Sequence, residues 1–456
     1  MLIISKVSRL AAVRAQLGDD EDQLRRHFGA AFPRVRESHD THEQSVKLLL
    51  EALGTSAGAA AAFAHPPRVE YINSTQVALA DDGRDGGGDG GWAAAAGAPA
   101  SRLDEAVGAA SVVIAAGGDG TYLRAAAHIR GPRGPLLVGV NTDPSRSRGK
   151  LLAYSRCGRH GFAPFVAALE ALGAPPSADS GAGDGDGARP QLYHMTRSRL
   201  RVTIASGGAA DDDGDGGNES GRRWNWKARR DGDGDGDRTV LAVSALNEVF
   251  LGESDPSRPS VHDVSVVGGS SIGSGKSSGI DSDSGGGGGG GELRRKCACR
   301  RSSGVLVSTG TGATAWMQSA ASAGVPALSQ LDVALVLKAA SRVQAPPSMV
   351  QRVTDLVNRY KAKIAVPALI AANSAKLLYH IREPIVPHGG EAAGGAPTSG
   401  TAGRVDVQMH GWRPMLILDG LLSCPVRNNE RVSLEIDPEN ALRTLGNDAH
   451  IEMEVE

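Results

Sequence analysis

Apolar runs alternate with helical patterns along the first part of the chain. Short apolar runs that fit strands cover Arg68 to Ile72, Ser111 to Ala116 and Pro135 to Asn141. Segments with helical spacing cover His39 to Leu53, starting behind Asp40 and Thr41, then Thr121 to Ile129 and Phe162 to Leu172. This alternating order predicts a parallel sheet with helices on its faces.

The pattern changes to strands after the last of these helices. Apolar or alternating runs that fit strands cover Leu200 to Ile204, Thr239 to Leu251, His262 to Val267, Gly304 to Ser308, Leu377 to Ile381, Val405 to Met409, Met415 to Leu418 and Val432 to Ile436. Helices are expected only at Thr314 to Ser322 and Met349 to Tyr360. A run of strands with few helices predicts a mostly antiparallel second domain.

We therefore expect the fold class α/β plus β. The first domain is expected over residues 1–175 and the β-rich domain over 176–436, with residues 437–456 returning to the first domain. Four aperiodic segments rich in Gly, Ser, Ala and Asp interrupt the elements, at 81–100, 206–237, 268–291 and 388–403. Such compositions bury little apolar surface, so these segments are expected to be disordered loops between strands.

The composition excludes some classes of binding partner but does not identify one. The 456 residues include 49 Lys and Arg against 51 Asp and Glu, a net charge of -2. This balance predicts neither a nucleic-acid footprint nor a basic membrane patch, and no apolar run is long enough to span a bilayer. The 4 cysteines lack zinc-site spacing, so we expect free thiols and no protein-bound metal.

The first residues of the chain have two interpretations. Met1 to Gly18 carries Lys6, Arg9 and Arg14 but no acidic residue, which is the charge pattern of an organelle transit peptide. The same stretch begins with Leu2-Ile3-Ile4, which is typical of a first strand. The residues alone leave both interpretations open.

The strongest chemical signal lies at Val112 to Thr121, where an apolar strand runs into a glycine turn and then a helix. Gly117, Gly118 and Gly120 let the backbone approach a ligand closely, and N–H groups at a helix start bind phosphate oxygens. Asp119 is the one acid in this turn. A carboxylate beside phosphates indicates a task such as accepting a hydroxyl proton, whereas the simpler alternative is a residue that only caps the helix.

A second polar signal is the pair Asn247-Glu248, flanked by Leu246, Val249 and Phe250. Burying an amide and a carboxylate costs several kcal/mol unless both are hydrogen-bonded, and ribose hydroxyls of a nucleotide could supply the partners. The alternative is a pair at a strand end that is satisfied by neighbouring backbone groups.

Gly-Gly-Asp-Gly-Thr resembles the loop shared by NAD kinases, diacylglycerol and sphingosine kinases, and phosphofructokinases. Three further segments are similar to the mitochondrial branch of the NAD kinase family. They are Val138 to Gly149 (VGVNTDPSRSRG), Ala245 to Val249 (ALNEV) and Ser308 to Trp316 (STGTGATAW). The order of these segments distinguishes the NAD kinases from the other two families.

The resemblance implies an N-terminal Rossmann-like α/β domain and a C-terminal β-rich, sandwich-like domain. It implies transfer of a phosphoryl group from ATP, with Mg²⁺ held through the nucleotide, to the 2′-hydroxyl of the adenosine ribose of NAD. It makes Asp119 catalytic. Nucleotide phosphates are assigned to Gly117, Gly118, Gly120, Thr121 and Asn141, and NAD to Asn247, Glu248, Thr314, Ala315 and Ser319. A homodimer and a mitochondrial location are also implied.

The sequence departs from the family pattern at two positions that would otherwise supply polar contacts. Ser302-Ser303-Gly304 stands where the family often has Gly-Asp-Gly, and Ala313 replaces a serine. The alternatives are a lipid kinase and a catalytically silent NAD(H)-binding protein. The presence of Asp119 and Glu248 favours an active enzyme over the silent protein.

Overall fold

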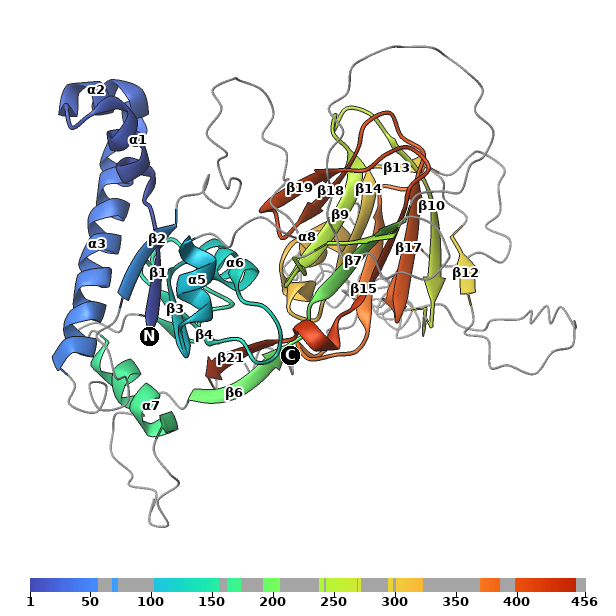
Figure 1. Cartoon of the computed structure of the whole chain (residues 1–456). Coiled ribbons are helices and arrows are strands. Elements are labelled where there is room, and N and C mark those ends of the chain that lie inside the picture. Colours follow the sequence, from blue (N-terminus) through green and yellow to red (C-terminus); the bar gives the residue numbers. More distant parts are fainter. Residues whose placement is uncertain are drawn as a thin grey trace, which may run out of the picture.

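The computed structural model describes residues 1–55, 68–72, 102–155, 162–173, 192–205, 238–241, 243–268, 270–271, 294–297, 301–322, 370–385 and 398–447. A first sheet and its helices occupy one side of the molecule, and two further sheets occupy the other (Figure 1). The expected helix at Met349 to Tyr360 lies outside the described residues.

The first sheet is parallel over most of its width. Its strands run in the order β2-β1-β3-β4-β21-β6, with β5 paired to β4. Their bounds are β1 Leu2–Lys6, β2 Arg68–Ile72, β3 Val112–Gly117, β4 Leu136–Asn141, β5 Tyr154–Ser155, β6 Leu192–Arg197 and β21 Leu442–Asn447. The sheet confirms the parallel arrangement that the alternating pattern predicts.

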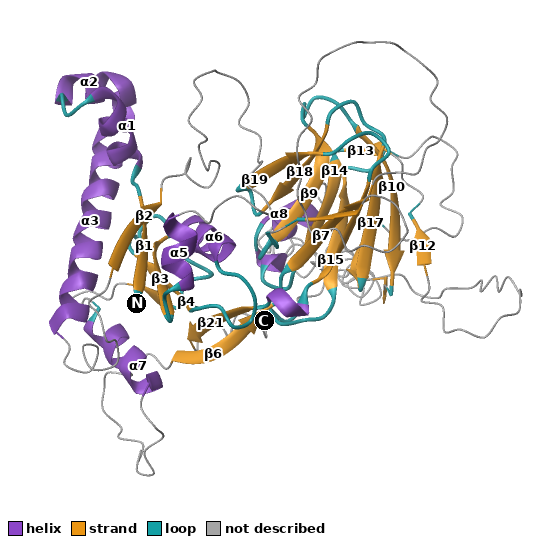
Figure 2. Ribbon diagram, in the orientation of Figure 1, coloured by secondary structure: helices purple, strands orange, loops and turns teal. Residues whose placement is uncertain are grey.

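Helices cover both faces of this sheet (Figure 2). One face packs on α5 (Arg102–Gly108) and α6 (Asp119–His128), and the other on α3 (Phe32–Thr55) and α7 (Ala163–Gly173). The middle residues of β3 are fully buried because they face apolar helices on both sides. Helix α3 begins well before the Asp40 start that the sequence suggests, and α1 (Arg9–Leu17) and α2 (Glu21–Phe28) pack against its first half.

The order of the parallel strands indicates where a ligand would bind. The chain proceeds from β1 outward to β2 and then returns to β3 on the opposite side of β1. Ligands of open α/β sheets bind beyond the carboxyl ends of the strands at this point of reversal. The glycine turn that follows β3 lies at that position.

The last strand, β21, returns to the first sheet and pairs with both β4 and β6. Strand β6 belongs to the same sheet although it lies in the range 176–436 expected for the β-rich domain. The edge of the sheet therefore does not coincide with a boundary at residue 175. Buried Tyr122 of α6 donates to or accepts from Thr444 at 2.5 Å, which fastens β21 to the helix that carries Asp119.

The second half of the molecule contains two antiparallel sheets. One runs β12-β10-β17-β20-β7-β8, with β13 paired to β10, and the other runs β11-β16-β15-β14-β9-β18-β19. The bounds of the first are β7 Leu200–Ala205, β8 Arg238–Val240, β10 Ser260–Val267, β12 Arg294–Lys296, β13 Arg301–Ser302, β17 Arg404–Met409 and β20 Arg431–Ile436. The bounds of the second are β9 Glu248–Glu253, β11 Ser270–Ser271, β14 Gly304–Ser308, β15 Leu377–Arg382, β16 Ser399–Ala402, β18 Pro414–Leu418 and β19 Leu422–Pro425. Apolar residues of both sheets share one core, so the sheets pack face to face.

Three details differ from the sequence expectations. Thr239 to Leu251 is not one strand, because the chain leaves β8 after Val240 and enters β9 only at Glu248. The range 388–403 is not wholly a loop, because Ser399–Ala402 forms β16 between β15 and β11. Ser270–Ser271 forms β11 inside the range 268–291. Strands β16 and β11 consist of small and polar residues, so a search for apolar runs does not predict them.

Two short helices follow β14, the 3₁₀ helix η4 (Gly312–Thr314) and α8 (Trp316–Ser322). They confirm the helix expected at Thr314 to Ser322. Within the described residues, no helix combines the length and apolar character that crossing a membrane requires.

The segment 206–237 joins two strands that pair directly, with Ala205 opposite Arg238. Replacing it by a short Asn-Gly turn should leave the hairpin intact, because loop length has only a weak effect on closure entropy. We expect the thermal midpoint and turnover of the shortened protein to equal those of the wild type. A folded variant with strongly reduced turnover would show that the segment has a function.

Candidate nucleotide-binding site

The glycine turn after β3 is tightly packed where it meets α6. A side chain at Gly117 would overlap the Thr121 side chain, and one at Gly118 would lie 3.1 Å from the Ser147 hydroxyl. Gly118 is the N-cap residue of α6 and contributes no side-chain cap. Space is open at Gly120, where an added side chain would meet nothing within 4 Å, so the start of α6 has room for an anion there.

Asp119 is the first residue of α6, and its carboxylate is held by a neighbouring loop. The backbone N–H of Leu151 donates to Oδ1 at 2.9 Å, and that of Lys150 donates to Oδ2 at 3.2 Å. The carboxylate thus points across to this loop. Each oxygen keeps a second lone pair, so either can accept a proton or a hydroxyl hydrogen bond.

The loop that holds Asp119, residues 142–151, is folded around Asn141 at the end of β4. Asn141 is 1% exposed; its Nδ2 donates to the Ser147 carbonyl at 2.9 Å and its Oδ1 accepts from the Asp143 N–H at 3.1 Å. Gly149 packs on the same amide with φ 62, where a side chain would lie 2.7 Å from Nδ2. Asn141 shapes the loop in this structure, and its direct contact with a nucleotide stays a prediction.

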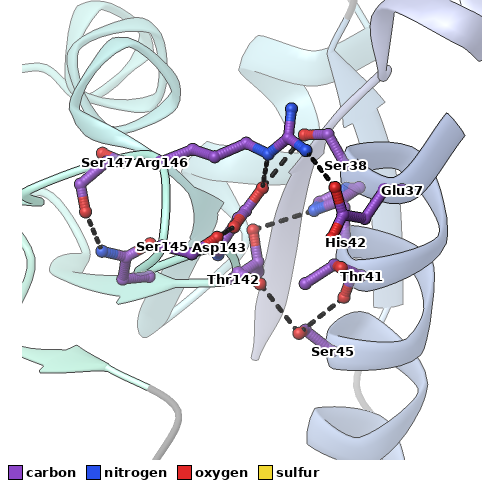
Figure 3. A network of polar contacts seen from close by, with 11 residues as sticks. Glu37, Ser38, Thr41, His42, Ser45, Thr142, Asp143, Ser145, Arg146 and Ser147 are labelled. Atoms are coloured by element: carbon purple, nitrogen blue, oxygen red, sulfur yellow. Dashed lines mark hydrogen bonds and ion pairs between the residues drawn. The ribbon is translucent and has the colours of Figure 1, made fainter. Parts of the chain in front are cut away.

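A buried polar network fastens the start of this loop to α3 (Figure 3). His42 Nδ1 lies 2.9 Å from the Thr142 hydroxyl, and Ser38 donates to the Asp143 carboxylate at 3.0 Å. Arg146 pairs with Glu37 at 2.7 Å. Burial lowers the pKa of His42 to about 4, so the ring is neutral near pH 7. The neutral ring connects α3 to the loop by a hydrogen bond.

The Asn247-Glu248 pair stands where the chain enters β9. The two residues are 6% and 8% exposed. The Asp419 carboxylate accepts the backbone N–H groups of Leu246, Asn247 and Glu248 at 2.7, 2.7 and 3.0 Å. Asp419 lies in the turn between β18 and β19 with φ 51, a conformation that Asp tolerates in tight turns. This carboxylate fixes the backbone of the pair.

Two buried side-chain atoms of the pair are left without partners among the described residues. They are Asn247 Oδ1 and Glu248 Oε2. Burial, together with the nearby Asp419 carboxylate, raises the pKa of Glu248 to about 8. A neutral carboxyl group and an amide oxygen match hydroxyl groups, which both donate and accept. The pair therefore fits a ligand with hydroxyls better than it fits an anion.

The second glycine loop, Ser308 to Ala315, packs directly on this pair. A side chain at Gly312 would overlap the Asn247 carbonyl, and the Thr309 N–H donates to the same carbonyl at 2.9 Å. The loop carries Thr314 and Ala315, both half-buried, to the neighbourhood of the pair, whereas Ser319 is exposed on α8.

One side chain joins the two loops. The Lys150 ammonium donates to the Thr314 carbonyl at 2.9 Å. The loop that holds Asp119 is thereby in contact with the loop that packs on Asn247. Hydrogen bonds therefore link Asp119, through Lys150, to the second glycine loop, and that loop to Asn247.

Arg199 provides a second connection between the two halves. Its guanidinium donates to the carbonyls of Ile129 and Ala126, at 2.7 and 3.0 Å, and so caps the end of α6. Burial lowers its pKa to about 10, while Asp419 favours the charged form. The cation remains charged near pH 7 and complements the negative end of the helix dipole.

The sequence interpretation missed three residues of this site: Lys150, Arg199 and Asp419. Asp419-Gly420 between two apolar runs is a hairpin signal, but nothing in that signal indicates which backbone the carboxylate contacts. Arg199 and Lys150 carry no local signal. Their roles depend on contacts between segments that only the fold brings together.

No family model matches this chain. Two curated proteins named "NAD kinase 2, mitochondrial", from Homo sapiens and Rattus norvegicus, are each 28% identical to it over 344 residues. The match covers 75% of this chain, 66% of the human protein and 69% of the rat protein. The chain thus spans about two thirds of the length of these relatives.

Among solved structures, an NAD kinase from Archaeoglobus fulgidus in complex with ATP gives a TM-score of 0.41 at 12% identity, covering 99% of this chain and 96% of that one. Yeast NADH kinase complexed with NADH gives 0.41 at 10% identity, covering 100% and 85%. A TM-score of this size does not establish a common fold.

The fold combines a mostly parallel α/β sheet, with a glycine turn after β3, and two antiparallel sheets that share one core. The sequence comparison confirms the resemblance to the NAD kinase family, and in particular to its mitochondrial branch.

The raised pKa of Glu248 predicts a pH-dependent stability. An unfolded glutamate titrates near 4.5 and the folded one near 8. Above pH 4.5 the unfolded state binds fewer protons, so the contribution of Glu248 is complete below that pH and is lost as pH rises toward 8. Glu248→Gln, which does not titrate, should gain stability relative to the wild type between about pH 5 and pH 8.

Denaturant unfolding at several pH values measures this difference. Glu43→Gln, an exposed substitution on α3, is the matched control and should follow the wild type. A Glu248→Gln curve that runs parallel to the wild-type curve would contradict the assignment.

Proposed function

We propose that this protein is an NAD kinase that transfers the γ-phosphoryl group of ATP to the 2′-hydroxyl of the adenosine ribose of NAD. The observation that carries the proposal is the contact between the Asp119 loop and the loop beside Asn247-Glu248, through Lys150 and Thr314. This contact supports a single site in which the glycine turn would bind phosphates and the pair would bind hydroxyls. The named relatives support the same reaction.

The phosphates would lie at the glycine turn. Gly117, Gly118 and Gly120 would offer N–H groups, with open space at Gly120, and the start of α6 adds the positive end of its dipole. Thr121 is 4% exposed and packs against Gly117, so its part is to fix the shape of the turn.

The NAD ribose would lie at the Asn247-Glu248 pair. Ribose hydroxyls supply the partners that Asn247 Oδ1 and Glu248 Oε2 lack. The raised pKa of Glu248 keeps it protonated near pH 7, so it can donate one hydrogen bond and accept another. Thr314, Ala315 and Ser319 would contact the remainder of the NAD molecule.

Asp119 would accept the proton of the 2′-hydroxyl, or orient that hydroxyl, as its oxygen attacks the γ-phosphorus. The N–H groups of Lys150 and Leu151 hold the carboxylate in place, which is the positioning that phosphoryl transfer requires. The γ-phosphoryl group then leaves ADP and joins the ribose oxygen.

Magnesium would arrive with ATP. Within the described ranges, no three His, Cys, Asp or Glu side chains converge in a metal-binding cluster. We propose that the phosphates supply most ligands to Mg²⁺, whose chemistry is to neutralise phosphate charge. The resemblance also supports a mitochondrial location and self-association as parts of the proposal.

A lipid kinase is the alternative that shares the glycine turn. Purified protein should form NADP from NAD, ATP and Mg²⁺ in a coupled assay and should leave diacylglycerol unphosphorylated. Phosphorylation of the lipid without NADP formation would reverse the assignment.

Asp119→Asn tests the catalytic role. The amide retains the shape of the turn but removes the proton acceptor and its charge, so turnover should fall by about 10² to 10⁴. The dissociation constant for NAD should change little, because the carboxylate acts mainly on the transition state. Near-normal turnover would show that Asp119 only shapes the turn.

A further inference from the structure

The loop 142–151 carries three cations, and they have different environments. Arg146 is paired with Glu37 and with Asp143. Arg148 is exposed to solvent. Lys150 is half-buried and reaches out of its own loop to the second glycine loop.

Lys150 has an unusual partner for a charged group in a partly buried place. Its ammonium donates to the Thr314 carbonyl, which is neutral, and no ion pair of Lys150 is found among the described residues. An ammonium has three N–H donors, so this one hydrogen bond leaves two without a partner in the part of the chain that the structure describes. A partly buried charge is costly without an anionic partner.

The position of Lys150 indicates what that anion would be. Its backbone N–H donates to Asp119 Oδ2, and its side chain ends at Thr314. The side chain therefore extends from the group that would accept the hydroxyl proton to the loop beside the NAD pair. In the proposed reaction, the phosphoryl group would move from ATP to NAD beside this side chain.

We propose that Lys150 binds the γ-phosphoryl group of ATP and neutralises its charge during transfer. This inference rests on the proposed function, which makes NAD the acceptor of the phosphoryl group. The contact between Lys150 and the γ-phosphate of ATP can nevertheless be measured without turnover. The ammonium uses its spare donors for phosphate oxygens while the Thr314 carbonyl keeps it in place. A lysine is suited to this task because it is a compact charge on a flexible stem.

Lys150→Met tests the proposal, because it keeps the backbone N–H that holds Asp119 and removes only the charge. Binding of the ATP analogue AMP-PNP should weaken by roughly 10- to 100-fold, as expected for loss of a charged hydrogen bond. Binding of ADP, which lacks the γ-phosphate, and of NAD should stay within about threefold of the wild type. Turnover should fall by about 10² to 10³.

Two further variants make the result specific. Lys47→Met removes an exposed lysine of α3 and should change nothing. Lys150→Arg retains the charge and should keep most of the preference for AMP-PNP over ADP. A thermal midpoint for Lys150→Met close to that of the wild type shows that the fold is intact.

If Lys150 only held the two loops together, without contacting phosphate, Lys150→Met would give a different pattern of nucleotide affinities. Equal weakening of AMP-PNP and ADP, or no weakening of either, would overturn the inference even if the wild type forms NADP. Conversely, loss of AMP-PNP binding in Lys150→Met, in a protein that forms no NADP, would support the phosphate contact and reject only the proposed acceptor.

Discussion

The arrangement of the site depends on a buried carboxylate that organises three consecutive peptide groups. Asp419 accepts the N–H groups of Leu246, Asn247 and Glu248, and thereby fixes the backbone where β9 begins at Glu248. Burial raises the pKa of Asp419, while these three N–H groups and the Arg199 guanidinium favour its charged form. Removing the carboxylate would leave buried N–H groups without partners, at a cost of about 1 to 3 kcal/mol each.

Several polar contacts connect the half that would bind phosphate to the half that would bind NAD, among them those of Arg197, Arg199 and Lys150. Arg199 caps the end of α6 and interacts with Asp419, so the helix that carries Asp119 and the Asn247-Glu248 pair share one electrostatic neighbour. Lys150 adds the contact with Thr314 on the other side of the site. Because β21 also returns to the first sheet beside β4, the two halves are tied at several places in the sequence.

The sequence predicts the elements of this fold well where apolar residues are periodic, as in β3, β4 and α6. It fails where packing decides the structure: the small and polar residues of Ser399–Ala402 form β16 because β15 and β11 flank them. Within the site, Asp119 and the Asn247-Glu248 pair are visible because polar groups stand beside apolar strands. Asp419 and Lys150 are not visible, because their roles depend on partners 171 and 164 residues away.

The central claim is that Asp119 faces the 2′-hydroxyl of a ribose held by Asn247 and Glu248. A crystal structure with NAD and AMP-PNP bound together measures this directly. The account predicts the adenosine 2′-oxygen within about 2.6 to 3.2 Å of the Asp119 carboxylate, with ribose hydroxyls at the Asn247-Glu248 pair. An NAD molecule whose adenosine ribose lies away from both groups would contradict it.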